Sequence, residues 1–352
     1  MFPMKKYKIN GHGHILPEPK EIPKFMKDKK LFWIGDDKKF MYQDEWSRPI
    51  TDASFFFNEK IEWMDKHNID HGVMLNLSQL YCNGWAKQDT YDTIRWQNDF
   101  NYSVQARRPD VFTTGFVVQP LYIDDALNEI ERCVKLGMKL LCLPTHFLNK
   151  EGEWLSVVDD STLPIFELAN KYSLAIELHP YDAQKMVKLK DSYWRFHLVW
   201  MMAQTADTLH LYSLKDYANR FPNIRTCFAH GCMLGQANYG RRLQGYDGRP
   251  DLFDDVNDPR CSLGHKNIFF DTLVHDAYTL QLLKIRVGSS QIVAGLDDPY
   301  PLGEMEGVAN SYPGRVIDFA VQAKILVQEE SDQIWKGNVL KWLGVDSVPG
   351  MK

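Results

Sequence analysis

Four polar clusters lie far apart in this sequence, each at the end of an apolar run with the pattern of a β-strand. The first is a His-x-His pair, His12 and His14 in INGHGHILP. The others are His179 in AIELHP, His230 in TCFAHG and Asp297 in IVAGLDDPYPLGE. Residues two apart on a strand share a face, so the pair supplies only two metal ligands and needs the later clusters to complete a site. One ligand group per strand end, over nearly the whole chain, predicts a barrel with a metal at its mouth.

Apolar runs and helical stretches alternate along the chain. Runs rich in Val, Ile, Leu and Phe predict eight strands, at residues 7–15, 71–77, 113–118, 138–143, 174–178, 224–228, 267–272 and 291–295. Helical patterns between them cover residues 58–67, 89–107, 123–136, 162–172, 205–221 and 277–287. This alternation is typical of a parallel sheet, and eight units favour an α/β fold closed as a (β/α)8 TIM barrel over an open doubly wound sheet. No Gly-x-Gly-x-x-Gly motif opens a helix after a strand, which weakens the dinucleotide-binding alternative.

The chain has enough apolar sequence for one large core. It holds 352 residues, of which 44% are hydrophobic and 13% aromatic. Because barrels of this kind carry long insertions within one unit, we expect a single domain over residues 1–352. Residues 17–57, with prolines, lysines and aromatics after the first strand, are expected to form a small inserted lobe beside the barrel mouth. A second irregular stretch, residues 231–266, follows the sixth strand.

Charge and hydropathy restrict the partners. The formal net charge is −5 with the two signs interspersed, so no basic stripe favours nucleic acid and a small-molecule substrate is expected. No run approaches the roughly 18 consecutive apolar residues of a membrane-spanning helix. The first residues, MFPMKKYKIN, lack the apolar core of a secretory signal, so a cytoplasmic location is expected.

The six cysteines form no Cys-x-x-Cys pair. Cys133, Cys142 and Cys227 lie in apolar helix or strand patterns and are expected to be reduced core residues. Cys232 lies two residues after His230, and packing is the expected role for it as well.

Position in the barrel separates the histidines. Active-site side chains lie at the C-terminal ends of barrel strands, and the five residues of the four clusters meet that condition. Imidazoles with one carboxylate suit zinc, with manganese, iron or cobalt as other possibilities. His146 and His275, after the fourth and seventh strands, either line the pocket or bond to loop backbone. The remaining histidines do not meet the condition and are expected to be structural or surface residues: His67, His71, His197, His210 and His265.

The motifs also carry a resemblance. GHGHILP, LHPYD, CFAHG, FDTLVHD and GLDDPYPLGE, in this order, resemble the amidohydrolase superfamily, within it the branch that contains 2-amino-3-carboxymuconate 6-semialdehyde decarboxylase. The last motif is similar to the family's Gly-x-Asp-Tyr-Pro-Phe-Pro-Leu-Gly-Glu. The resemblance spans almost the whole chain.

The resemblance implies a (β/α)8 barrel with one divalent metal, usually zinc, bound by His12, His14, His179 and Asp297. His230 would be the general acid/base beside the metal, and Asp297 would share in proton transfer. Binuclear relatives carry a carboxylated lysine at the end of the fourth strand. This chain reads CLPTH there, which is consistent with a single metal.

The resemblance also implies three substrate-binding residues. Arg48, upstream of the WMDKHNI segment, falls where the family places a carboxylate-binding arginine. Arg241, in NYGRRLQGYDGRPDL, matches an arginine that reaches the active site of a neighbouring subunit, which would make the protein a homodimer. Trp200 is the first candidate for the family's pocket tryptophan, and Trp194 is the alternative. Two guanidinium groups suit a substrate with two carboxylates.

The chain departs from the family pattern at three positions near the expected metal ligands. Asn10 replaces the usual acidic or apolar residue before His-x-His, Cys232 stands where Gly is frequent, and Asp298 follows Asp297 where Tyr is usual. These departures bear on the substrate rather than on the metal site.

The expected reaction is a metal-dependent, non-oxidative decarboxylation of a small carboxylate such as 2-amino-3-carboxymuconate 6-semialdehyde. A divalent metal makes hydroxide available near neutral pH, and an acid such as His230 must return a proton after CO₂ leaves. The alternatives are a hydrolase or hydratase on the same site, a related hydroxybenzoate-type decarboxylase, and a barrel that has lost activity. Retention of all five mouth residues argues against the last of these.

Overall fold

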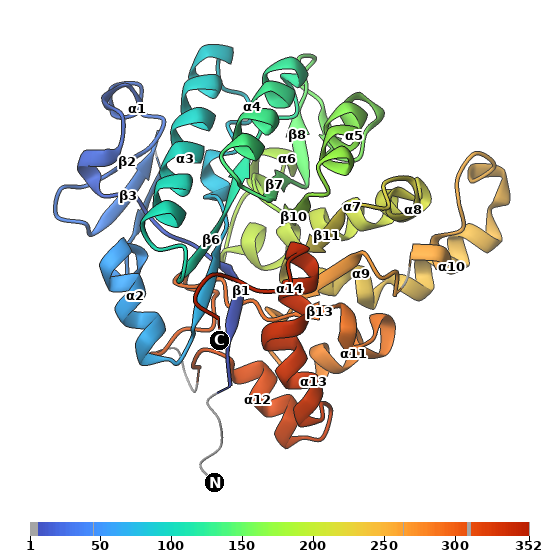
Figure 1. Ribbon diagram of the computed structural model, residues 1–352. Helices are drawn as coiled ribbons and strands as arrows, with labels where there is room; N and C mark the ends of the chain where they lie inside the picture. The colour runs from blue at the N-terminus through green and yellow to red at the C-terminus, as the bar shows by residue number, and fades with distance from the viewer. Residues whose placement is uncertain (1–5, 45, 263, 308–310, 352) are drawn as a thin grey trace, which may run out of the picture.

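The computed structural model describes residues 6–44, 46–262, 264–307 and 311–351, and these form an eight-stranded parallel barrel surrounded by helices (Figure 1). In spatial order the strands are β1 (Ile9–Gly13), β5 (His71–Met74), β6 (Phe112–Val117), β7 (Leu140–Pro144), β10 (Ala175–His179), β11 (Arg225–Phe228), β12 (Ile268–Asp271) and β13 (Ile292–Val293). Each overlaps one of the predicted strands. The prediction of a (β/α)8 barrel is therefore confirmed.

The barrel closes between its first strand and the segment that follows its last strand. Gly11 N donates to Ala294 O at 2.7 Å, and Leu296 N donates to His12 O at 3.2 Å. An isolated parallel bridge joins Gly13 to Asp298. These contacts continue past the end of β13 and bring the carboxyl end of β1 against the residues that follow β13.

The helices that alternate with the strands are α2 (Phe57–Lys66), α3 (Lys87–Arg107), α4 (Ile123–Lys135), α5 (Leu163–Lys171), α7 (Met201–Leu214) and α11 (Ala277–Val287). Their buried faces follow the helical period. On α4, for example, the buried apolar residues are Ala126, Ile130 and Cys133. Such faces pack on the outside of the barrel to form the largest apolar core.

The prediction of one helix over residues 205–221 is wrong. Helix α7 begins earlier, at Met201, directly after a π-helical turn over Phe196–Trp200, and it ends at Leu214. A short helix, α8 (Tyr217–Arg220), then follows. Asp216 between them takes a left-handed backbone conformation with φ of 51°, which interrupts the helical hydrogen bonds.

The amino-terminal end of the barrel is closed by helix α14 (Asn338–Leu343), whereas α12 (Arg315–Gln322), which precedes it together with α13 (Gln328–Asp332), packs against α11 in the outer layer. Trp342 on α14 is completely buried, and its indole N–H donates to Ile176 O at 3.2 Å. It packs in a second core with inward-facing strand residues such as Ile9, Ala175 and Phe269. This end of the barrel is therefore filled, and the opposite end remains for a site.

A small lobe lies between β1 and α2, beside the mouth, where the sequence predicted an insertion; the bounds 17–57 stay a prediction. Within the described chain it holds α1 (Lys24–Asp28) and a three-stranded antiparallel sheet of β2 (Trp33–Ile34), β3 (Phe40–Gln43) and β4 (Trp46–Pro49). Its apolar side chains pack against Leu77 and Leu80 after β5 and against Tyr300 after β13. The lobe is therefore anchored at the carboxyl ends of the strands.

The remaining described segments follow individual strands of the same barrel. The hairpin β8 (His146–Leu148) and β9 (Trp154–Ser156) follows β7, and the short helix α6 (Ala183–Met186) follows β10. The stretch after β11 contains α9 (Met233–Ala237) and α10 (Tyr239–Gly248), and α10 projects away from the barrel (Figure 1). No helix in the described part of the chain is both long and apolar enough to cross a membrane. The extent of the chain as one domain stays a prediction.

Candidate metal centre

The five residues of the sequence clusters converge at the mouth of the barrel. His12 lies in β1 with His14 one residue beyond its end, and His179 is the last residue of β10. His230 follows β11, and Asp297 lies four residues after the end of β13. All five side chains are buried. They come together because carboxyl ends of parallel barrel strands share one rim.

The donor atoms of this cluster lie close enough to share one cation. His14 Nε2 is 3.1 Å and His12 Nε2 is 3.6 Å from Asp297 Oδ1. Two overlapping groups, His12–His14–Asp297 and His12–His179–His230, each place their donor atoms within 4.8 Å of one another. Imidazole nitrogens with one carboxylate are ligands that zinc and other divalent transition metals accept.

Three ring nitrogens of the cluster lack hydrogen-bond partners in the described structure. They are the buried Nδ1 atoms of His14, His179 and His230. Buried polar atoms are seldom left unpaired because the lost hydrogen bond to water is not replaced. For His14 the nitrogen that faces Asp297 is Nε2, so the fit of these residues to the divalent metal expected from the sequence rests on the closely spaced donor atoms of the cluster.

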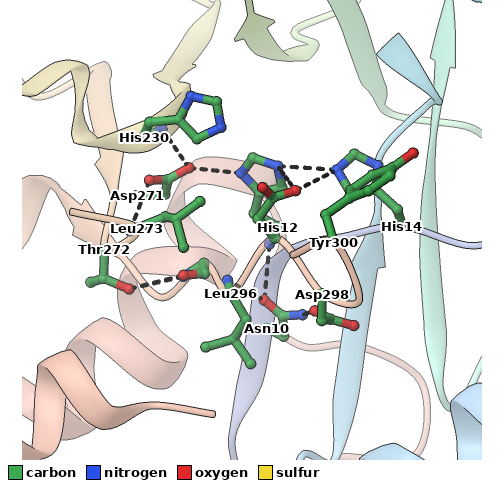
Figure 2. Close-up of polar contacts among 12 residues, drawn as sticks. Asn10, His12, His14, His230, Asp271, Thr272, Leu273, Leu296, Asp298 and Tyr300 are labelled. Atoms are coloured by element: carbon green, nitrogen blue, oxygen red, sulfur yellow. Dashed lines mark hydrogen bonds and ion pairs between the residues drawn. The ribbon is translucent and has the colours of Figure 1, made fainter. Parts of the chain in front are cut away.

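Asp271, the last residue of β12, organises the cluster from behind, and the sequence patterns did not single it out. Its Oδ2 lies 2.8 Å from His12 Nδ1, and it also accepts a hydrogen bond from His230 N at 3.0 Å (Figure 2). Its Oδ1 accepts hydrogen bonds from Gly231 N and Leu273 N. A carboxylate on Nδ1 fixes the tautomer of His12 and turns Nε2 towards the metal position.

The electrostatic field at the cluster favours positive charge. Burial lowers the pKa of His12, but the hydrogen bond to Asp271 and the charge of Asp297 outweigh burial and raise it to about 9. Burial raises the pKa of Asp297, yet the hydrogen bond with His14 and the neighbouring imidazoles bring it well below its usual range. Asp271 and Asp297 are therefore both ionised at neutral pH, and their negative charge also favours a bound cation.

His230 differs from His12 in its surroundings. Burial lowers its pKa to about 4, although Asp271 and Asp297 oppose this shift. Its backbone is left-handed, with φ of 57°, and the hydrogen bonds from His230 N and Gly231 N to Asp271 hold that turn in place. The ring is therefore neutral at pH 7 and can accept a proton.

A cavity of about 300 Å³ opens in front of the cluster. Such a volume suits a small ligand. Besides cluster residues, the cavity is lined by polar and aromatic side chains from the lobe, from the loops after the strands and from the turn before α7: Arg48, Ser78, Gln79, Tyr181, His197, His275 and Tyr300. His275 is thus a pocket residue. His197 also lines the cavity, so the prediction that it is only structural or on the surface is wrong; it follows no strand, and the barrel pattern gave no signal for it.

Arg48 lies on β4 of the lobe and reaches the cavity between two aromatic rings. Its guanidinium carbon is 4.8 Å from the ring centroid of Tyr300 and 5.9 Å from that of Trp194. No carboxylate pairs with Arg48 among the residues that the structure describes. A cation held by aromatic faces and left without an acidic partner is suited to bind an anionic group of a ligand.

The other predicted substrate residues lie elsewhere. Trp200 lines a second cavity, together with Trp154 and with His146, whose Nε2 is 3.0 Å from Asp207 Oδ2. Arg241 is exposed on the projecting helix α10. The structure thus brings Arg48 into the described lining of the cavity, whereas Trp200 and Arg241 lie outside it. Trp194 is not a described lining residue either, but its ring lies against the Arg48 guanidinium.

Comparisons with known proteins agree with this arrangement. A family model described as amidohydrolase matches residues 87–332. The chain is 28% identical to a 2-amino-3-carboxymuconate-6-semialdehyde decarboxylase of Dictyostelium discoideum over 97% of this chain and 93% of that protein.

Solved structures with the same fold include the 5-carboxyvanillate decarboxylase of Sphingomonas paucimobilis, with a TM-score of 0.76 and 16% identity over 96% of this chain and 99% of the other. Another is a dihydroxybenzoic acid decarboxylase of Polaromonas sp. JS666 with bound manganese and the inhibitor 2-nitroresorcinol, with a TM-score of 0.69 and 14% identity over 98% of this chain and 99% of the other.

Replacing Asp271 tests whether it orients His12. We expect Asp271→Asn to weaken binding of a divalent metal by about 10- to 100-fold, because His12 loses the carboxylate that fixes its tautomer. Metal affinity is measured by competition with a chelator, and circular dichroism checks the fold. Asp276→Asn is the matched control, since Asp276 caps α11 at the surface and Asn caps equally well. Unchanged affinity in folded Asp271→Asn protein would contradict the assignment.

Proposed function

The chain belongs to the amidohydrolase family, as the order of its motifs indicated, and we propose that it is a metal-dependent decarboxylase that releases CO₂ from a small carboxylate without oxidation. One observation carries this proposal. The guanidinium of Arg48, free of any acidic partner in the described chain, faces the same cavity as the histidine and aspartate cluster. A substrate carboxylate held by Arg48 thus lies within one cavity of the groups that perform the chemistry.

The proposed metal is a single Zn²⁺ held by His12, His14, His179 and Asp297. The short distances among the donor atoms of His12, His14 and Asp297, and between those of His12 and His179, support it. The related decarboxylase with bound manganese makes Mn²⁺ the competing choice. When bound, a divalent cation attracts electrons from a substrate oxygen and lowers the pKa of a bound water.

The residues around the cavity orient the substrate. Arg48 can bind a carboxylate through two parallel N–H groups, and Tyr300 and Trp194 hold the plane of its guanidinium. Tyr300 is itself fixed, because its hydroxyl donates to Gln79 Oε1 at 3.2 Å and its ring packs edge-on against His14. A planar acid would thus be held in one orientation towards the cluster.

His230 is the proposed proton carrier. When CO₂ leaves, the electron pair of the broken C–C bond stays on the substrate carbon, and a proton must take the place of the carboxyl group. A proton taken from the solvent can pass through the ring of His230 to that carbon, so that one proton is consumed for each CO₂ released. Its position beside His179, with ring centroids 4.9 Å apart, places it at the edge of the ligand cluster.

Hydrolysis and hydration are the alternative reactions of such a centre, and one experiment separates them. We expect the metal-loaded protein, supplied with 2-amino-3-carboxymuconate 6-semialdehyde and with hydroxybenzoates, to release CO₂ in equal amount to the substrate consumed. Coupled CO₂ detection and mass spectrometry of the product make the measurement. A product heavier by one water, with no CO₂, would contradict decarboxylation.

The cytoplasmic location expected from the sequence stays a prediction.

Replacing His230 tests its proposed role. We expect His230→Ala to lower turnover by about 10²- to 10⁴-fold, the usual contribution of general acid/base catalysis, while keeping the metal. The donor atoms of His230, His12 and His179 lie close enough to hold one metal ion, so metal content is measured in the same preparation. His265→Ala, on the segment before β12 at the other end of the barrel, is the control. Loss of the metal would instead make His230 a ligand, and normal turnover with metal present would remove it from catalysis.

Arg241 supports a further part of the proposal, that the active protein is a homodimer. The side chain is exposed on α10, which projects from the barrel, and this placement suits an arginine that enters the site of a second copy (Figure 1). In a dimer with twofold symmetry each subunit would supply Arg241 to the other, and each cavity would then contain two guanidinium groups.

Mixed dimers test this arrangement. Arg241→Ala and His230→Ala subunits, each inactive alone, are combined under conditions that exchange subunits. If Arg241 acts across the interface, one cavity of each mixed dimer contains both intact residues and activity returns. Mixed dimers that form but remain inactive would show that Arg241 serves its own chain or has no part in binding.

A further inference from the structure

A buried ion pair lies directly behind the metal cluster. Lys60 belongs to α2, in the outer layer of helices, yet its side chain is completely buried. Its Nζ lies 2.5 Å from Asp298 Oδ2, and Asp298 is completely buried too. Asp298 immediately follows the cluster residue Asp297. The pair therefore ties the outer helical layer to the segment that carries Asp297.

Asn10 extends this pair into β1. Its side-chain Nδ2 donates to Asp298 Oδ1 (Figure 2). Its Oδ1 accepts hydrogen bonds from His12 N and from Leu296 N, both at 3.1 Å. One amide group thus bonds to the backbone on both sides of the barrel closure, next to His12 and next to Asp297.

The backbone of Asp298 completes the arrangement. Its carbonyl accepts a hydrogen bond from His14 N at 2.8 Å, and Asp297 N donates to His12 O at 2.8 Å. Asp297 itself has φ of 50°, a left-handed conformation that residues with a Cβ adopt at a cost. The contacts on both neighbours keep it there.

Gly13 shows how closely these groups approach the chain. A Cβ at this position would lie 2.9 Å from Asn10 Nδ2 and 2.9 Å from Asp298 Oδ1. The hydrogen bond between Asn10 and Asp298 therefore passes over the residue between His12 and His14, and only glycine leaves room for it.

We propose that Lys60, Asp298 and Asn10 form a buried clamp that positions His12, His14 and Asp297 to bind the metal. Lys60 is then a positioning residue for the site although it lies on an outer helix. The inference rests on the metal centre proposed above, and it concerns what holds the ligands rather than which residues they are.

General energetics favour this role over a purely stabilising one. Taking two charges out of water is costly, and well-packed apolar residues often stabilise a fold as well as a buried ion pair does. Removing one partner alone is severely destabilising, because the other charge is left unpaired. Here the pair fixes the orientation of the Asp298 carboxylate, because its two oxygens bond to different partners, Oδ2 to Lys60 and Oδ1 to Asn10.

The test compares single and double replacements. Lys60→Met leaves a buried carboxylate unpaired and is expected to destabilise the fold. Lys60→Met/Asp298→Asn leaves no net charge buried, and we expect its apoprotein to regain most of the wild-type thermal stability. Its Zn²⁺ affinity, measured with a competing chelator, should stay about tenfold or more below that of the wild type, as for other residues that orient metal ligands.

Two further variants complete the design. Lys66→Met removes the exposed partner of Glu306 from the same helix and should leave both stability and Zn²⁺ affinity unchanged. Asn10→Ala leaves the ion pair intact but removes the acceptor of His12 N and Leu296 N, and we expect it to weaken Zn²⁺ binding as the double variant does. If the double variant folds and binds Zn²⁺ like the wild type, the pair only balances charge and the proposal is overturned. If the double variant does not fold, unchanged Zn²⁺ affinity in Asn10→Ala overturns it.

Hydrogen exchange of the apoprotein separates the clamp from the proposed function. The amides of His14 and Leu296 donate into the clamp and should exchange slowly in the wild type and faster in the double variant. If the wild type binds no Zn²⁺, the proposed metal centre fails, and these exchange rates still report on the clamp. Equal exchange rates in both folded proteins would exclude it.

Discussion

Closure of the barrel between β1 and the segment after β13 is the contact on which the site depends. The hydrogen bonds from Gly11 N to Ala294 O and from His14 N to Asp298 O join the two ends of the sheet. They place the His-x-His pair, near the start of the chain, against Asp297, near its end. Without this contact Asp297 would not lie beside His12 and His14, and the cluster would lose its carboxylate. The other mouth histidines come from strands that pair elsewhere in the barrel.

Two buried carboxylates near the metal cluster, those of Asp271 and Asp298, have hydrogen-bond partners on the side away from the cavity. Asp271 accepts hydrogen bonds from the ring of His12 and from three backbone N–H groups, so its burial leaves no oxygen unpaired. Asp298 is paired with Lys60 and Asn10 in the same way. Both carboxylates are therefore fully hydrogen-bonded although they are buried. The charges of Asp271 and Asp297 and the closely spaced donor atoms of the cluster both favour a cation at the mouth.

The cavity is built by parts of the chain that lie outside the regular barrel. Arg48 comes from the inserted lobe, His197 from the π-helical turn before α7, and Tyr300 from the segment after β13. Tyr300 contacts both Arg48 and His14, so the lobe and the metal cluster are coupled through one ring. The same barrel can therefore act on different acids when these segments change, because the strands supply the reactive centre and the loops supply the shape.

The sequence by itself determined the eight strands and the cluster at their ends. Apolar runs fix which residues are buried, and the polar residue that ends such a run must lie at the rim, as it does for His179 and Asp297. It did not determine the break at Asp216 or the pocket position of His197, and it gave no sign of Lys60 beneath the cluster. These three features depend on which side chains come into contact when distant segments pack, and the periodicity of strands and helices does not predict such contacts.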